Sequence, residues 1–326
     1  MQTPFRTLLA FVPVALALAH PAQAQTQTLL FNEQFDTSSR WSTVTKNPAN
    51  SARYIGSAWQ QYAPLANTTP DSFNLFNTEW GNPPVQGTGD GAEGKFLRLK
   101  LSTYNPNNFK ANRATKYAFG TELQTLRTFG PPAVGHAIDY EARVRLPSFI
   151  PGLIGSFYTY SQRLNAGTVY SDEIDFEYLN GNGTGSDNSV QVVTWNDWAR
   201  RNDVDLVPGQ NYFDGVHHYA TTVPSINRTT WHYLKVRWLR LANGQYRTEF
   251  YSKQNASDTY NLIYTENNVR PDAAMAIHLN IYSVGGAIPT SAPGTSSYMD
   301  VDWCRVYDVT LPSTATIKKT PSNPRS

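Results

Sequence analysis

Residues 234–251 read LKVRWLRLANGQYRTEFY and contain the pattern that decides the fold. Apolar and basic side chains alternate from Leu234 to Trp238, and a second alternating run ends at Tyr251. This period of two is typical of strands that bury one face in a core. The dipeptide Asn243-Gly244 lies between the two runs, and it is among the strongest short-range signals for a β-hairpin. We therefore predict two antiparallel strands joined by a tight turn.

The same alternation recurs along the chain, whereas helical periodicity is nearly absent. Further predicted strands are 96–101, 140–146, 154–160, 189–194, 275–282 and 298–309. Many short strands separated by polar turns favour an all-β fold, a sandwich or jelly roll of two antiparallel sheets, over a parallel α/β sheet. Residues 42–90 are rich in Asn, Pro, Gly and Ser, and we expect long loops there.

The amino terminus predicts export. A single charged residue, Arg6, precedes an apolar run that is too short to span a membrane, and Ala22-Gln23-Ala24 offers a cleavage site. We expect a secretory signal peptide over 1–24, one large domain over 25–312, and a disordered tail over 313–326. Removal of Arg6 lowers the formal charge from +2 to +1. This balance indicates neither nucleic acid nor a membrane as partner, and we expect a secreted monomer.

Cysteine and histidine suggest no redox or metal chemistry. Cys304 is the one cysteine, so no internal disulfide can form, and its strand-like surroundings predict a buried, inert thiol. His136, His217 and His218 lack a third ligand at a useful spacing, so we expect no catalytic metal.

The segment 171–180, SDEIDFEYLN, concentrates charge in a chain with only 16% charged residues. On a strand, Glu173, Asp175 and Glu177 project from one face, while Ile174 and Phe176 face a core on the other. Neighbouring carboxylates repel one another, and at least one of them should have a raised pKa. Carboxylates with separated pKa values are typical of glycoside hydrolysis, in which one group is the acid and another the base or nucleophile.

Other interpretations of this segment remain open at this point. An acidic, solvated strand face would carry the same residues, whereas a calcium-binding loop fits poorly because the pattern lacks the glycine turn. The distance between the outer two carboxyl groups also restricts the shape of the strand. Retaining glycosidases hold two carboxyl groups ~5 Å apart, but the Cα atoms of residues i and i+4 on a flat strand are about 13 Å apart. The motif therefore makes chemical sense only on the hollow side of a curved sheet.

At this point the sequence resembles glycoside hydrolase family 16. SDEIDFEYLNGNG is similar to the active-site strand of that family, with its ExDxE motif. Four other segments, between residues 96 and 309, resemble family strands: GTELQ at 120–124, YEARVRLP at 140–147, GLIGSFYTY at 152–160 and WHYLKVRW at 231–238. The segment LNIY at 279–282 stands where the family often has NLW.

The resemblance implies a concanavalin-like β-jelly roll with a substrate cleft on its concave sheet. It implies Glu173 as nucleophile, Glu177 as acid/base, and Asp175 as the group between them that tunes the pair. For substrate contacts it points to a further set of residues, namely Glu122, Tyr158, Tyr160, Trp195, Asn196 and Tyr282. Asp302 corresponds to a position that helps hold a structural calcium in relatives, and catalysis would need no cofactor.

The spacing of the motif bears on the substrate. One residue separates Asp175 from Glu177, and in the family this regular form goes with lichenases and xyloglucan-active enzymes. We therefore expect a retaining endo-glycosidase that cleaves a β-glucan-type polysaccharide, with mixed-linkage β-1,3-1,4-glucan favoured. The alternatives are a transglycosylase or xyloglucan-active enzyme with the same carboxylates, and a non-catalytic lectin on the same fold.

Overall fold

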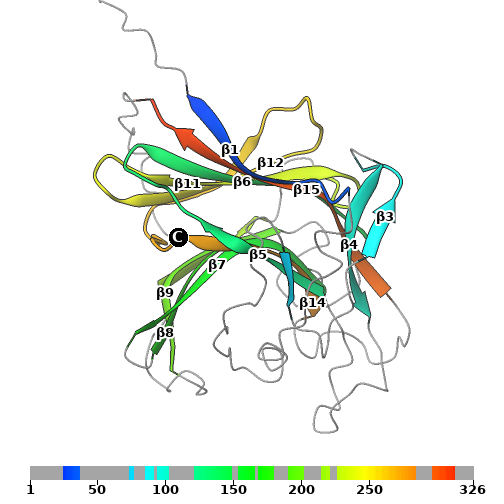
Figure 1. Cartoon of the computed structure of the whole chain (residues 1–326), viewed down its shortest axis with the longest axis horizontal. Coiled ribbons are helices and arrows are strands. Elements are labelled where there is room, and N and C mark those ends of the chain that lie inside the picture. The colour runs from blue at the N-terminus through cyan, green and yellow to red at the C-terminus, as the bar shows by residue number, and fades with distance from the viewer. Residues whose placement is uncertain are drawn as a thin grey trace, which may run out of the picture.

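A computed structural model describes residues 25–36, 73–76, 85–91, 94–102, 121–148, 153–165, 168–179, 190–201, 214–220, 226–283 and 296–312. The predicted signal peptide and the predicted tail lie outside these residues. The described part contains strands and turns but no helix, so it offers no helical segment that could cross a membrane. Two antiparallel sheets pack face to face, which confirms the predicted all-β jelly-roll sandwich (Figure 1).

The eight-stranded sheet, called sheet A, has the order β13-β12-β11-β6-β15-β4-β3, and β1 also pairs with β15. Its strands are β1 (Thr26–Glu33), β3 (Val85–Thr88), β4 (Lys95–Ser102), β6 (His136–Ser148), β11 (His232–Arg240), β12 (Tyr246–Lys253), β13 (Asn261–Glu266) and β15 (Ser296–Thr310). The last strand in the sequence is therefore internal to the sheet.

The seven-stranded sheet, called sheet B, has the order β10-β9-β8-β7-β14-β5-β2. Its strands are β2 (Phe73–Phe76), β5 (Thr121–Phe129), β7 (Leu153–Asn165), β8 (Thr168–Leu179), β9 (Val190–Arg201), β10 (Asp214–Ala220) and β14 (Met275–Ser283). β2 and β3 fall within residues 42–90, so the expectation of loops throughout that region was wrong for these two short strands.

The predicted hairpin at Asn243-Gly244 is confirmed. β11 and β12 pair from Tyr233↔Lys253 to Arg240↔Tyr246. The amide of Leu241 donates to the carbonyl of Gln245 at 2.7 Å and closes the turn. Gly244 has a φ of 77°, a conformation that glycine adopts without the steric cost of a side chain.

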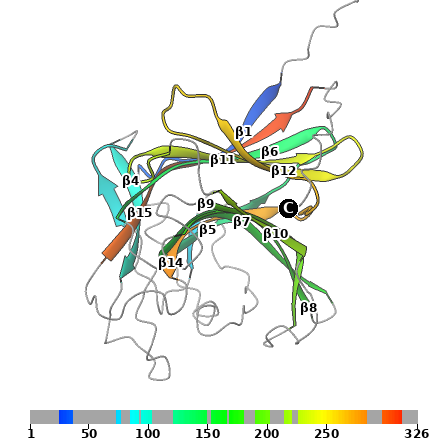
Figure 2. The same cartoon turned by 180° about the vertical axis from the view of Figure 1, so that it is seen from behind.

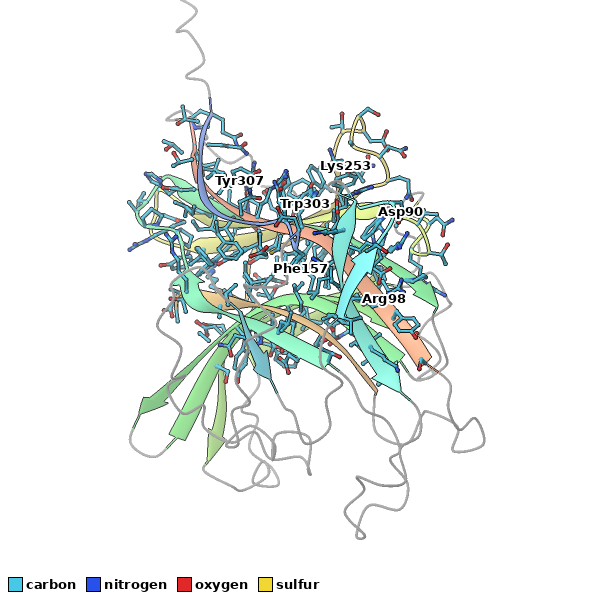
Figure 3. The ribbon with its side chains drawn as sticks, turned by 45° about the vertical axis from the view of Figure 1, so that its right-hand side comes forward. Asp90, Arg98, Phe157, Lys253, Trp303 and Tyr307 are labelled. Atoms are coloured by element: carbon cyan, nitrogen blue, oxygen red, sulfur yellow. The ribbon has the colours of Figure 1, made fainter. Side chains whose placement is uncertain are left out.

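The core lies between the two sheets and is built from the inward halves of the alternating strands. Phe157 of β7 lies in the space between the sheets in Figure 3, and Trp238 of β11 is buried from the opposite side. Cys304 of β15 is also fully buried, and burial raises the pKa of its thiol. The predicted inert thiol is thus confirmed in its burial.

Aromatic residues also cover the outer face of sheet A, where they stack with cations. Arg145 lies over the ring of Trp231 at 4.4 Å, and Arg305 lies over Trp303 at 4.2 Å. Figure 3 shows Trp303 on the side of sheet A that faces away from Phe157. Such contacts shield aromatic surface while the charged groups remain near water. Part of the aromatic content of this chain therefore stabilises an outer face that is not core.

Candidate active site

β8 places the three carboxylates of the SDEIDFE motif on one face. Ile174 and Phe176 are fully buried in the core between the sheets, as the alternation predicts. Glu173, Asp175 and Glu177 consequently point away from sheet A. Sheet B curves so that this outward side is hollow, as both views show (Figures 1 and 2). The condition of a curved sheet, which the spacing of the carboxylates required, is met.

The ladder around the acidic residues is regular between Asp175 and Glu177. On β7 the two residues pair with Tyr158 and Ser156, and no register shift falls between these pairs. The pairing with β9 is regular over the same two residues. The strand therefore has no bulge between Asp175 and Glu177, which confirms the prediction made from the spacing.

Asp175, the middle acid of the motif, has a raised pKa. Burial raises the pKa of Asp175 well above its ordinary value, and the charges of Glu173 and Glu177 raise it further. A hydrogen bond with Glu173 raises the pKa too, whereas one from the indole of Trp195 lowers it. An acid that keeps its proton donates to an ionised neighbour, so Asp175 donates to Glu173. A carboxyl group whose pKa is raised beside other carboxyl groups is typical of sites that perform acid–base chemistry on a glycosidic bond.

A β-bulge next to the motif sets the position of Trp195. Ser171 pairs with Trp198, and Glu173 pairs with Trp195, so β9 has one residue more than β8 over this interval. Bulges of this kind redirect side chains near functional sites. Trp195 lies beside Glu173 and bonds to Asp175, and Asn196 is half-buried at the bulge itself.

Tyr158 and Tyr160 lie on the same face as the acids, across the ladder from Asp175 and Glu173. Both are nearly covered, at 4% and 2% exposed. Tyr160 forms a hydrogen bond with Ser171 at 2.8 Å, and Tyr158 donates to Oε1 of Glu122. Glu122 belongs to β5 and is itself 2% exposed. The structure therefore brings these three predicted contact residues together with the acidic strand as the buried floor of the concave face.

Sequence reasoning missed two polar residues of this region. His278 of β14 contacts Glu122 and Tyr158, and it lies across the ladder from Tyr158. Asp172 of β8 is fully buried, and its Oδ2 accepts the amides of Asp272 and Ala273 at 3.0 and 2.9 Å. The alternation in strand 275–282 places His278 on the polar face, but it does not reveal which strand lies beside it.

Of the remaining two predicted residues, Tyr282 belongs to β14 of sheet B and Asp302 belongs to β15 of sheet A. The backbone of Tyr282 pairs with Ile154 at the end of β14, and its side chain lies outside the described residues. Asp302 of β15 is buried on sheet A, where its Oδ2 accepts a hydrogen bond from Arg143 at 2.5 Å.

That ion pair bears on the implied calcium. The guanidinium already supplies a counter-charge for the buried carboxylate of Asp302. Calcium takes six to eight oxygen ligands, and the described residues contain no cluster of three or more His, Cys, Asp or Glu that could hold a metal. A calcium ion at Asp302 would thus depend on backbone oxygens. It stays a prediction, which thermal unfolding with added calcium and with a chelator would test.

Fold and site together define a jelly-roll sandwich whose concave sheet carries a strand of three carboxylates. Solved structures share this fold at low identity. An endo-1,3-β-glucanase from Streptomyces sioyaensis has a TM-score of 0.51 at 16% identity, over 90% of this chain and 100% of that one. LamA from Z. galactanivorans, in complex with laminaritriose and laminaritetraose, has a TM-score of 0.50 at 17% identity, over 86% and 98%.

A third similar structure is the κ-carrageenase from Pseudoalteromonas carrageenovora in complex with an oligotetrasaccharide of κ-carrageenan. Its TM-score is 0.50 at 14% identity, over 91% of this chain and 100% of that one. No family model and no curated protein matches the chain. At these identities the comparisons show the fold, and it is the fold that the resemblance to glycoside hydrolase family 16 implies.

Proposed function

We propose that this protein is a secreted, endo-acting glycosidase that cleaves β-glucan-type polysaccharide by a retaining double displacement. The observation that carries the proposal is the arrangement on β8. Three carboxylates share the concave face of a curved sheet, and the middle one has a raised pKa and a hydrogen bond to Glu173. On a solvated acidic face Asp175 would be exposed to water. Here it is buried between two other carboxylates, and burying a carboxyl group in this way costs free energy of folding.

In the proposed mechanism, Glu173 attacks the anomeric carbon as a carboxylate, and the bond from that carbon to the glycosidic oxygen breaks. Glu177 gives its proton to the departing oxygen. Glu177 then removes a proton from water, the resulting oxygen attacks the anomeric carbon, and the ester to Glu173 breaks. The product keeps its anomeric configuration because two inversions occur. The roles of Glu173 and Glu177 come from the family resemblance.

Asp175 would support the first step through Glu173. Its donated hydrogen bond stabilises the ionised nucleophile before attack, and its retained proton limits the repulsion within the row. Trp195 acts on Asp175 from the other side, because its indole N–H donates to that carboxyl group. The two hydrogen bonds fix Asp175 and Glu173 in position before the reaction. Such preorganisation of polar groups is a large contribution to electrostatic catalysis.

Mixed-linkage β-1,3-1,4-glucan is the favoured substrate, because β8 is regular between Asp175 and Glu177. The similar structures named above include an endo-1,3-β-glucanase and a κ-carrageenase, so a panel of polysaccharides has to decide. Barley glucan, lichenan, laminarin, xyloglucan and agarose should be incubated with the protein, and the linkages of the products identified. Cleavage of laminarin or agarose alone would contradict the argument from strand regularity.

The central test is Glu173→Ala. This substitution removes the proposed nucleophile, and we expect turnover to fall by at least about 10³-fold while polysaccharide binding persists. A matched control is Asp308→Ala, which removes a partly exposed carboxylate that pairs with His136 where strands β15 and β6 of sheet A meet. That variant should cleave like the wild type. Undiminished turnover in Glu173→Ala would refute the mechanism.

Two alternatives remain distinguishable. A transglycosylase would use the same carboxylates, and products longer than the starting oligosaccharide would identify it. A lectin would bind polysaccharide without any turnover by the wild type. Export rests on the amino-terminal sequence, and cleavage after Ala24 would leave Gln25 as the first residue of the secreted protein.

A further inference from the structure

Two donors hold one oxygen of Glu122. The hydroxyl of Tyr158 and the Nδ1 of His278, at 3.0 Å, both contact Oε1. When the Glu122 carboxyl group is ionised it can only accept hydrogen bonds, and the tautomer of His278 that fits it carries its proton on Nδ1. The three residues come from β5, β7 and β14, and His278 is 156 residues away from Glu122 in the sequence.

The ring of His278 is itself fixed in orientation. It stacks on Tyr158 with ring centroids 4.6 Å apart and an interplanar angle of 30°, and it meets Tyr160 edge-on at 5.8 Å. The side chain is fully buried. The imidazole therefore cannot turn away from Glu122 unless two tyrosines move as well, and both tyrosines face the acidic residues of β8.

Glu122, Tyr158 and His278 lie in sheet B to one side of the carboxylates that are proposed to break the glycosidic bond. Asp175, Tyr158 and His278 lie opposite one another on β8, β7 and β14. Glu122 lies one strand further, on β5. Adjacent strands are about 4.8 Å apart, so Glu122 is on the order of 14 Å from β8. A polysaccharide that crosses the strands would lie over this buried carboxylate at a distance from the bond that is cleaved.

We propose that His278 is a positioning residue of the substrate-binding floor. It fixes Glu122 and Tyr158 in a single arrangement, and this arrangement shapes the surface on which a polysaccharide binds beside the acidic strand. This inference rests on the proposed function, which it extends to a residue with no assigned role. The chemical step belongs to Glu173 and Glu177, so the loss of His278 should weaken substrate binding more than it slows the reaction.

The test compares three substitutions, with the polysaccharide of the panel that the wild type cleaves fastest. His278→Leu removes the donor, and we expect KM to rise about tenfold while kcat changes by less than about twofold, because a hydrogen bond to a charged group is lost. His278→Asn retains an N–H near the position of Nδ1 and should restore most of the affinity. His278→Gln places its amide near the position of Nε2 and should not.

A double-mutant cycle shows whether His278 acts through Glu122. In a Glu122→Gln background, the further substitution His278→Leu should change KM by less than about twofold, since the partner of the lost hydrogen bond is already altered. His232→Leu is the matched control, because His232 is a fully buried histidine outside the concave face. It should lower the melting temperature and leave KM unchanged.

The outcomes separate this inference from the proposed function. An unchanged KM in folded His278→Leu, or additive effects in the cycle, would overturn the positioning role while the wild type remains active. If His278→Leu does not fold, equal KM values in the Asn and Gln variants would overturn it instead. A wild type that cleaves none of the polysaccharides would refute the proposed function, and this inference with it.

Discussion

The surroundings of the Asp175 carboxyl group disfavour its ionisation. It is buried, and a carboxylate two residues away on each side raises its pKa further. An acid whose pKa is raised by folding stabilises the folded state below the unfolded pKa of about 3.9, and this stability is lost as the pH rises through the folded pKa. At neutral pH, Asp175 therefore lowers the stability of the protein, as residues at active sites often do.

Because Asp175 lowers the stability of the folded protein at neutral pH, replacing it by Asn should raise that stability. The amide cannot ionise, so the variant should be more stable than the wild type at pH 7, and the gain in stability should shrink toward pH 4. Turnover should fall because the tuning of Glu173 is lost. Denaturant unfolding at several pH values measures the first effect. Asp308→Asn, at a partly exposed ion pair, should show neither effect.

Strand β8 carries the proposed catalytic carboxylates, and it also anchors a neighbouring segment of the chain. Asp172, one residue before Glu173, points into the structure and accepts two amides of the segment that leads into β14. The same segment is held from sheet A, because the indole of Trp238 donates to the carbonyl of Pro271 at 3.1 Å. The acidic motif is thus tied to the strand that carries His278.

Asp172→Ala should loosen this connection. The amides of Asp272 and Ala273 would lose a charged acceptor, and we expect a loss of about 2–3 kcal/mol of stability. Hydrogen exchange should accelerate at these two amides more than in the β11–β12 hairpin. Asp172→Asn retains one carbonyl oxygen and should lose less. Equal exchange in the Ala variant and the wild type would show that the anchor contributes nothing.

Local sequence predicted the elements well because each strand carries its own alternation. The face of Glu173, Asp175 and Glu177 follows from spacing within a single strand, and so does the turn at Asn243-Gly244. The pairing of β7 with β14 does not, because Tyr158 and His278 are far apart in the sequence. The bulge at Asn196 likewise depends on how β9 meets β8. Contacts of this kind depend on which strands pair and in which register. The alternation of polar and apolar residues within one strand does not predict either.

A buried hydrogen bond joins sheet B to sheet A on the core side of β8, opposite the face that carries the three carboxylates. The hydroxyl of Tyr178 on β8 bonds to Nε2 of His232 on β11, and Nδ1 of His232 lies 3.0 Å from the carbonyl of Thr230. A carbonyl only accepts, so Nδ1 is the donor and Nε2 accepts from Tyr178. Burial lowers the pKa of His232 to about 4, although the bond to Thr230 opposes this shift.

This contact predicts an acid-sensitive stability. The unfolded chain binds a proton at His232 near pH 6.5, whereas the folded protein does so near pH 4. The stability that the neutral ring provides is therefore complete above pH 6.5 and is lost as the pH falls to 4, by about 3 kcal/mol. His232→Gln should lose less stability over this range, as measured by urea unfolding. An acid-induced loss in His232→Gln as large as that of the wild type would contradict this prediction.

The position of β15 has a consequence for how the protein is made. β15 pairs with β6 on one side and with β4 and β1 on the other, so it joins segments from both ends of the chain. A nascent chain that has not reached Ser296 leaves the hydrogen-bonding edges of β6, β4 and β1 open, and open edges invite aggregation. Translation thus supplies β15, which joins these strands of the larger sheet, after all three of its partners. Until it emerges from the ribosome, the chain needs protection from its own unpaired strands.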